Sequence, residues 1–313
     1  MRTFSVPTAK ALSSDGIPSR PPEQGEAGRI MDATGRPVCA TICPRVVREL
    51  FAGHPCIARR HVASVARWTV PDKRAHRGPH PEDERSFAPK WRPLLRRAVE
   101  HFSWLLTRGY AEKSALKIVG DHFQLTTRQR MAVLRSACAD DARAQRRKRE
   151  QSPRDVAGQH ILIDGYNVLT TIEAALAGGF LILGRDGCYR DMASMHGSFR
   201  RVAETAPAVE IVGRQLERLR VAGCTWYLDR PVSNSGRLRT LVLATAERFG
   251  RQWRVELVDN PDPVLAASPE IVASADSVIL DRCQRWFNLA RWTVDAAVPQ
   301  ARIIAMDDSA QRD

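Results

Sequence analysis

The sequence predicts an α/β fold: a three-layer arrangement with a mainly parallel sheet, preceded by a small all-α segment and a disordered basic tail. Three observations indicate this. After residue 157, apolar runs of strand length alternate with helical stretches. Residues 83–139 show helical periodicity alone. Residues 1–82 are rich in Pro, Gly, Ser and Arg and show no sustained periodicity.

The cysteine content and the hydropathy of the chain indicate in which cellular compartment the protein is expected. The seven cysteines are an odd number at irregular spacing, which does not suggest a disulfide framework. Neither a signal peptide nor a run of about 20 apolar residues is visible. We therefore expect a soluble, cytoplasmic protein that makes no membrane contact.

The helical segment is expected to contain three helices. The second runs from about Glu112 to Gly120, and the third begins after Thr126 or Thr127, which are good N-caps. Because the third helix opens with Arg128 and Arg130, the segment resembles a helix-turn-helix, whose second helix enters a nucleic-acid groove. A plain three-helix domain with solvated arginines is the alternative. The first helix is predicted by apolar residues at helical spacing: Leu95, Val99, Phe102 and Leu106.

Residues 140–157 are expected to form a basic linker without an apolar face. An extended helix and a flexible chain both remain open, since charge repulsion favours an open conformation unless phosphates neutralise it. A solvated linker without a ligand is the simpler alternative to a phosphate-binding one. The candidate nucleic-acid-binding residues are Arg143, Arg146, Arg147, Lys148 and Arg149.

Positive charge is concentrated in the first half of the chain. Residues 1–157 hold 30 Lys and Arg against 16 Asp and Glu, a net charge of +14. Residues 158–313 hold 18 Arg against 19 Asp and Glu, a net charge of −1. This split indicates a polyanion-binding segment attached to a catalytic or structural body. A basic surface that only aids solubility is the alternative.

The α/β part, residues 158–313, alternates strands with helices, which favours a parallel sheet covered on both faces. In such a sheet, ligands bind beyond the carboxyl ends of the strands. The predicted strands are residues 161–163, 180–183, 225–228, 255–258 and 302–305, and the intervening helices are centred on residues 165–177, 208–221, 236–249 and 276–287.

Acidic residues follow several of these strands. Asp164 and Asp229 each end a strand, and Asp276 opens a helix. Asp259 and Asp262 follow the strand at residues 255–258, and Asp307 and Asp308 follow the last strand. Carboxylates at one edge repel one another unless a divalent cation lies between them, and oxygen-rich sites suit Mg²⁺ or Mn²⁺. Any one of them could instead be a helix cap or turn former.

Other polar residues lie beside these strand ends. Asp186 and Asp281 are possible additional metal ligands. Arg230 and Arg237 follow Asp229 and precede or open a helix, so their guanidinium groups and nearby backbone N–H groups could hold a phosphate. An ordinary polar helix entry is the alternative.

Four motifs in this order resemble one family. Residues 161–168, Ile-Leu-Ile-Asp-Gly-Tyr-Asn-Val, are similar to the opening strand of NYN domains, the PIN-like ribonuclease group, where an Asp is followed three positions later by an Asn. Residues 227–229, 274–279 and 303–307 are similar to the later acidic motifs of the same family. The resemblance implies that Asp164, Asn167, Asp229 and Asp276 are catalytic, with Mg²⁺ or Mn²⁺ as cofactor. Relatives often carry an acidic residue where this chain has Ala273.

Three further stretches, residues 108–117, 186–191 and 229–237, are similar to a family of uncharacterised two-domain prokaryotic proteins. In that family, domain of unknown function 434 precedes a PIN-like domain of unknown function 5616, and the resemblance covers residues 78–290. Together these features predict a metal-dependent nuclease that hydrolyses RNA. A nucleic-acid-binding regulator of the same fold that does not cleave is the main alternative, and an interaction scaffold is the third.

Overall fold

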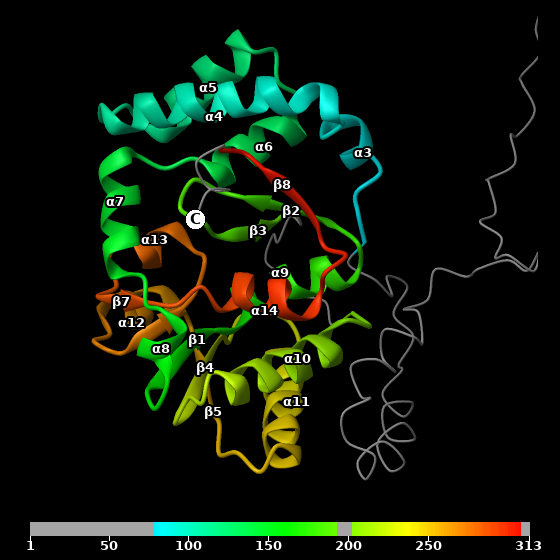
Figure 1. Cartoon of the computed structure of the whole chain (residues 1–313), viewed down its shortest axis with the longest axis vertical. Helices are drawn as coiled ribbons and strands as arrows, with labels where there is room; N and C mark the ends of the chain where they lie inside the picture. Colours follow the sequence, from blue (N-terminus) through cyan, green and yellow to red (C-terminus); the bar gives the residue numbers. More distant parts are fainter. Residues whose placement is uncertain (1–77, 193–201, 308–313) are drawn as a thin grey trace, which may run out of the picture. The chain divides into compact units, whose positions relative to one another are not determined.

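The computed structural model describes residues 78–192 and 202–307 of the 313-residue chain (Figure 1). Residues 1–77, which make up almost all of the predicted tail, lie outside the described residues. Within the described part, no helix is both long enough and apolar enough to cross a membrane. The fold class is confirmed, because a helical segment precedes an α/β domain with a five-stranded, all-parallel sheet.

The helical segment forms where the apolar repeat and the capping residues predict it. Pro93 lies in the first turn of α4, where no backbone N–H is needed for the helix. Thr126 caps α6 in a capping box, because its hydroxyl accepts from the Gln129 N–H at 3.3 Å while the Gln129 side chain accepts from the Thr126 N–H at 3.1 Å. The elements are α3 (Asp83–Ser86), the 3₁₀ turn η2 (Pro89–Trp91), α4 (Arg92–Thr107), α5 (Glu112–His122) and α6 (Thr127–Ser136).

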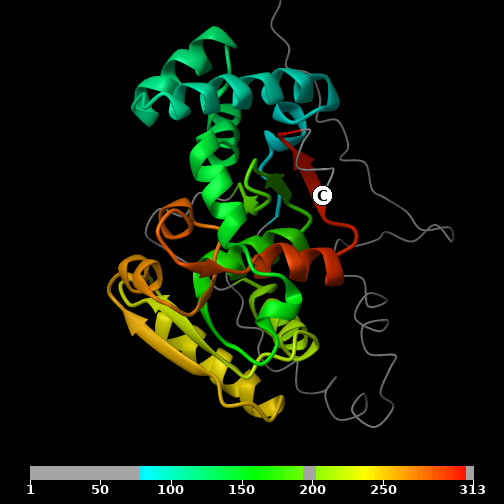
Figure 2. The ribbon, with the colours of Figure 1, turned by 60° about the vertical axis from the view of Figure 1, so that its left-hand side comes forward.

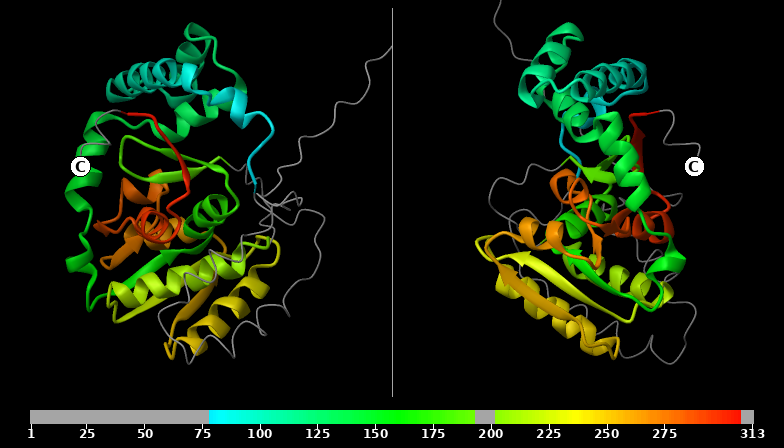
Figure 3. Two further views of the ribbon diagram at one scale, coloured as in Figure 1. Left: turned by 45° about the vertical axis from the view of Figure 1, so that its right-hand side comes forward. Right: turned by 90° about the vertical axis from the view of Figure 1, so that its left-hand side faces the viewer.

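The predicted linker contains a regular helix, α7 (Asp140–Arg149), which is followed by α8 (Pro153–Val156). Of the two forms that the sequence left open, the helix is therefore the correct one. Acidic residues occupy the first turn of α7 and basic residues the last, which complements the helix dipole. The views in Figure 3 show α7 along the side of the α/β domain, where the Trp286 indole donates to the Arg146 carbonyl at 2.8 Å.

The main sheet has the strand order β5-β4-β1-β6-β7, and every pairing in it is parallel. Strand β1 lies at its centre, with Asp164 opposite Tyr227 on β4 and Ile163 opposite Ala273 on β6. The carboxyl ends of these strands therefore meet at one edge. The strands are β1 (His160–Asp164), β4 (Gly223–Asp229), β5 (Arg254–Val258), β6 (Ile271–Ala273) and β7 (Arg285–Trp286).

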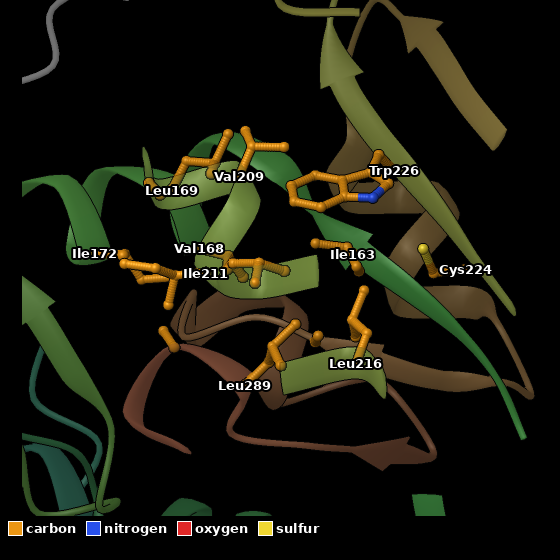
Figure 4. Packing of buried hydrophobic residues seen from close by; sticks show 14 of the residues in the cluster. Ile163, Val168, Leu169, Ile172, Val209, Ile211, Leu216, Cys224, Trp226 and Leu289 are labelled. Carbon is orange, nitrogen blue, oxygen red and sulfur yellow. The ribbon is translucent and has the colours of Figure 1, made fainter. Parts of the chain in front are cut away.

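Helices cover both faces of this sheet (Figure 2). Alternate residues of β1 face opposite ways: Ile161 and Ile163 join the larger core, whereas Leu162 packs in a smaller one with Leu265 and Ile279. Figure 4 shows the larger core, in which Ile163 and Trp226 from the sheet face apolar side chains of α9 and α10. One layer consists of α9 (Gly165–Leu176), α10 (Thr205–Arg218), α11 (Ser235–Arg248) and α14 (Leu289–Ala297), and the other of α12 (Pro261–Ala267) and α13 (Ser277–Leu280).

Two predicted strands belong to a second sheet, with order β3-β2-β8. Its strand β2 is buried on both faces, since Leu181 and Leu183 join the larger core whereas Phe180 and Ile182 pack among the helices α4 to α6. The helical segment therefore shares its core with this sheet and does not close one of its own. The strands are β2 (Phe180–Leu183), β3 (Tyr189–Asp191, antiparallel to β2) and β8 (Arg302–Ala305, parallel to β2).

Candidate acidic site at the carboxyl edge of the sheet

Asp164 ends the central strand β1 and immediately precedes α9. The next residue has to be glycine, because a Cβ at Gly165 would clash with the Leu228 side chain and would lie 3.0 Å from the Tyr227 carbonyl oxygen. Helix α9 can therefore begin against β4 without a side chain in between. This close approach leaves Asp164 only 7% exposed at the end of the strand.

Among the described residues, the side chain that hydrogen-bonds to the Asp164 carboxylate is that of Ser274. The Ser274 hydroxyl donates to Asp164 Oδ2 at 2.7 Å and accepts from the Asp276 backbone N–H at 3.0 Å. Burial raises the pKa of Asp164 to about 7, and the negative charges of nearby carboxylates add to the shift, whereas Ser274 opposes it. Within the described residues no cation forms an ion pair with Asp164.

Three further carboxylates act on Asp164, in the order Asp276, Asp262 and Asp229. Burial raises the pKa of Asp229, and Asp262 raises it further. The pKa of Asp262 is in turn raised by burial and by Asp276. The edge of the sheet thus holds four carboxylates within electrostatic reach of one another.

Asp276 also caps a helix. Its Oδ1 accepts from the Val278 N–H at 2.7 Å and from the Ile279 N–H at 3.4 Å, at the start of α13. Asp276 is therefore a helix cap, as the alternative interpretation expected, and it also lies close enough to Asp164 to raise the pKa of that residue. The second carboxylate oxygen takes no part in this cap.

Asn167, which the resemblance gave as a catalytic residue, holds the neighbouring loop. Its Oδ1 accepts from the Ala275 backbone N–H at 2.8 Å. Together with the Ser274 bonds, this contact fixes the segment between β6 and Asp276 against the start of α9. Asn167 is thus a positioning residue through its carbonyl oxygen.

Ser274 was not among the site residues predicted from the sequence, whereas Asp262 was expected at this edge but was not named as a metal ligand. A serine two positions before a helix-opening Asp is a recognisable local pattern, and it could have drawn attention to Ser274. Asp262 follows β5 at the same edge as Asp229, in the first turn of α12. Its place beyond the strand end is also typical of a simple helix-entry residue.

Three of the predicted metal ligands form ion pairs with arginines in this structure. Asp186 lies in the turn between β2 and β3, where its carboxylate receives Arg190 at 2.7 Å and Arg146 at 2.6 Å. Asp281 pairs with Arg146 at 2.7 Å. Asp307 follows β8 of the second sheet and pairs with arginines at 3.4 and 3.6 Å: Arg185 and Arg143.

Arg146, one of the predicted nucleic-acid contacts, is buried in this structure. It is 3% exposed and lies between Asp186 and Asp281, so its guanidinium is occupied inside the protein. It joins α7 to the α/β domain.

The two arginines that open α6 make contacts within the protein. Arg128 pairs with Asp83 at 2.7 Å and donates to the Met192 carbonyl at 2.6 Å, and Arg130 pairs with Asp121 at 2.7 Å. Buried residues of α6, such as Val133, pack in the core shared with β2 and β8. Helix α6 is therefore a structural element, as in the alternative of a plain helical segment.

The remaining basic candidates lie at the surface or close to it. Arg147 and Lys148 are exposed on α7, and Arg149 donates to the Asp281 carbonyl at 3.0 Å. Arg230 pairs with Asp259 at 3.3 Å in an exposed setting, and Arg237 donates to the Asn234 side chain at 3.4 Å.

The oxygen-rich donor set is compatible with Mg²⁺ or Mn²⁺, although the carboxylates do not form a closed cage. Among the described residues, no group of three or more His, Cys, Asp or Glu side chains converges on one point. Mg²⁺ does not need such a cage, because it commonly binds through one or two carboxylates together with water and substrate phosphate. Asp164 with one of its acidic neighbours satisfies this requirement.

The fold and this site define an α/β protein with an acidic carboxyl edge, and comparisons place it in a family. Residues 94–149 match the family described as "Protein of unknown function (DUF434)", and residues 153–292 match "Domain of unknown function (DUF5616)". "Uncharacterized protein MJ0935" of Methanocaldococcus jannaschii is 30% identical over 186 residues, which are 59% of this chain and 88% of that protein. The chain belongs to this family of DUF434–DUF5616 proteins. The comparison with solved structures gave no match.

Proposed function

We propose that this protein is a metal-dependent nuclease that hydrolyses phosphodiester bonds of RNA. The observation that carries the proposal is Asp164, a carboxylate that is 7% exposed, lacks a cationic partner among the described residues and faces three acidic neighbours. Leaving such a group charged is costly unless a cation compensates it. A divalent cation at the sheet edge supplies this compensation.

Each residue of the site has a role in this proposal. Asp164, Asp229 and Asp276 are the candidate ligands, with Asp262 as a fourth carboxylate nearby. Ser274 and Asn167 hold the loop that carries Asp276. Bound Mg²⁺ or Mn²⁺ lowers the pKa of a coordinated water and offsets charge that builds on a phosphodiester.

The proposed reaction is hydrolysis. The water oxygen forms a bond to phosphorus, the ester P–O bond breaks, and the leaving oxygen takes up a proton while the attacking water loses one. RNA is favoured because the order of acidic strand ends resembles the PIN-like ribonucleases. The chain departs from the PIN-like pattern at Ala273, where an acidic residue is common. Ala273 is a fully buried residue of β6 and precedes Ser274.

Basic residues beside the site support a polyanionic substrate. Arg230 directly follows Asp229, and its side chain is 61% exposed. Arg237 is exposed in the first turn of α11. Arg237 can exchange its 3.4 Å surface contact for a phosphate. Arg230 donates to the Leu257 carbonyl at 2.7 Å and can offer a phosphate the guanidinium nitrogen that now pairs with Asp259.

The proposal is tested by incubating labelled RNA and single-stranded DNA of the same sequence with the full-length protein, in Mn²⁺ or in EDTA. We expect cleavage of RNA in Mn²⁺ alone, and a loss of at least roughly 100-fold in Asp164→Asn. Asp281→Asn is the matched control, because Asp281 is bound to Arg146 and should not affect cleavage. Cleavage by Asp164→Asn at the wild-type rate would refute the assignment.

A non-catalytic nucleic-acid-binding regulator is the second candidate. It is favoured by Ala273, at a position where PIN-like relatives often carry an acidic residue, and by the absence of three converging ligands among the described residues. Salt-dependent RNA binding without cleavage in Mn²⁺ would identify this second function.

A further inference from the structure

Helix α4 presents a row of four exposed residues to solvent: Arg97, His101, Trp104 and Arg108. Their spacings of four, three and four residues put them on one face of the helix. At 1.5 Å per residue the row extends about 16 Å along the helix axis. The opposite face of α4 is buried in the core shared with β2 and β8. Glu100, the acidic residue of α4, lies at the edge of the row.

Trp104 is the centre of this α4 row. Its side chain is 52% exposed, although burying an indole is normally favourable. The Arg108 guanidinium lies 3.5 Å from the centroid of the Trp104 ring and donates to the Trp104 carbonyl at 3.3 Å. This contact holds the indole in place on the helix surface and leaves much of it open to solvent.

A second group of rings continues the row toward the start of α4. The His101 ring stacks on His122 of α5, with centroids 6.0 Å apart, and meets Phe123 edge-on at 5.1 Å. The Arg97 guanidinium lies 5.9 Å from the Phe123 ring centroid. Two flat rings, His101 and Trp104, therefore lie between two guanidinium groups along the row.

The chain segment that contains the row carries an excess of positive charge. Residues 94–149 hold 13 Lys and Arg against 5 Asp and Glu, a net charge of +8. Three of the six large hydrophobic side chains exposed in the described residues belong to this part of the chain: Trp104, Tyr110 and Ile118. A partner for this face has to be anionic and has to offer flat apolar groups.

We infer that the α4 row binds single-stranded RNA, with bases stacked on Trp104 and His101 and phosphates paired with Arg97 and Arg108. Base faces are available for such stacking only when the strand is unpaired, since a duplex buries them. This inference rests on the proposed function in taking RNA as the partner, and it adds that the RNA is bound as an unpaired strand. It does not depend on cleavage.

The experiment is fluorescence anisotropy of a short fluorescein-labelled oligouridylate, titrated with the full-length protein in EDTA. Trp104→Ala should weaken binding roughly tenfold, and Trp104→Phe should retain most of the affinity because a ring is still present. Trp292→Ala is the matched control, since Trp292 is a 36% exposed tryptophan on α14 that is outside the row. Replacing Arg97 and Arg108 together by Gln should lower the salt slope by about 0.7 for each phosphate that the protein no longer neutralises.

Three outcomes would overturn the inference: wild-type affinity in Trp104→Ala, the same loss in Trp292→Ala, or an equal loss for duplex RNA. Altered self-association of Trp104→Ala with unchanged RNA binding would also overturn it and assign the face to a protein contact. Thermal melts establish that the variants are folded. Cleavage in Mn²⁺ is measured separately, so a protein that binds oligouridylate through Trp104 without cutting it would support this surface and refute the nuclease proposal.

Discussion

Asp164 and Asp186 are both buried, yet their pKa values are shifted in opposite directions. Burial alone would raise the pKa of Asp186, but Arg190 and Arg146 outweigh it and hold that pKa well below its usual range. Asp164 is buried too, but it has a serine hydroxyl where Asp186 has two guanidinium groups, and its pKa is raised to about 7. The difference is whether the protein itself supplies the compensating cation.

This difference separates a structural carboxylate from a candidate functional one. The ion pairs of Asp186 tie α7 to the turn between β2 and β3, so that charge serves the packing of the two parts. The charge of Asp164 is left without a partner among the described residues, beside three carboxylates that increase its cost. Perturbed carboxylates of the second kind are typical of functional sites.

The largest loss of stability expected from a single substitution comes from removing an arginine that pairs with Asp186. Arg190→Met should destabilise the protein by about 3 kcal/mol, because it leaves a buried carboxylate with only Arg146 beside it. Urea unfolding measures the loss. Lys117→Met is the matched control, since its pair with Asp121 is exposed to solvent and should contribute little to stability.

A double variant, Arg190→Met with Asp186→Asn, sharpens the test. It should be less destabilised than the sum of the two single changes, because the buried charge and its partner are removed together. Additive losses would show that Asp186 and Arg190 stabilise the fold independently, and the contrast with Asp164 would then fail.

The second prediction is a pH dependence that is specific to Asp164. In EDTA its pKa is about 7 in the folded protein against 3.8 for an ordinary Asp, so the folded state binds this proton more tightly. The associated stability is fully present below the unfolded-state pKa and is lost as pH rises toward 7. The loss relative to Asp164→Asn should not exceed about 1.4 kcal/mol per pH unit.

Urea unfolding of the wild type and Asp164→Asn across this pH range measures the difference. Mn²⁺ added above pH 7 should restore stability to the wild type and should do so much less in Asp164→Asn. A pH-independent difference between the two proteins would mean that Asp164 is not an uncompensated carboxylate.

Much of the site geometry follows from local sequence patterns. Short apolar runs that end in Asp164 and Asp229 indicate strands, and alternation with helices indicates that these strands are parallel. Parallel strands bring their carboxyl ends to one edge, so the proximity of these residues to Asp276 could be predicted. Their place in the sheet did not require knowledge of any distant side chain.

The errors concern long-range choices. The runs that form β2 and β8 look like the other strands locally, and only the packing of Phe180 and Ile182 against the helical segment assigns them to another sheet. Asp307 moves with β8 to that sheet. The pairing of Arg146 with Asp186, 40 residues away, is not visible in sequence either.

The third prediction concerns the hydroxyl that supports Asp164. Ser274→Ala removes the one side-chain hydrogen bond to this carboxylate and should cost about 1–2 kcal/mol of stability above pH 7, where the group is charged. The pKa of Asp164 should rise further, and Mn²⁺ affinity should fall severalfold. Ser274→Thr, which keeps the hydroxyl, should restore the pH midpoint; failure to do so would indicate a packing effect.

The smallest expected effect separates the two carboxylates that Arg146 holds. Asp281 has a side chain that is 43% exposed, whereas that of Asp186 is 2% exposed, so water can replace the 2.7 Å pair between Arg146 and Asp281. Asp281→Asn should therefore cost less than about 1 kcal/mol in urea unfolding, and Arg146 keeps its pair with Asp186. Mn²⁺ affinity, measured by calorimetry, should be unchanged, because Asp281 is already occupied by a guanidinium. A loss of Mn²⁺ affinity comparable to that of Asp164→Asn would place Asp281 among the metal ligands after all and would remove the distinction between the compensated and uncompensated carboxylates.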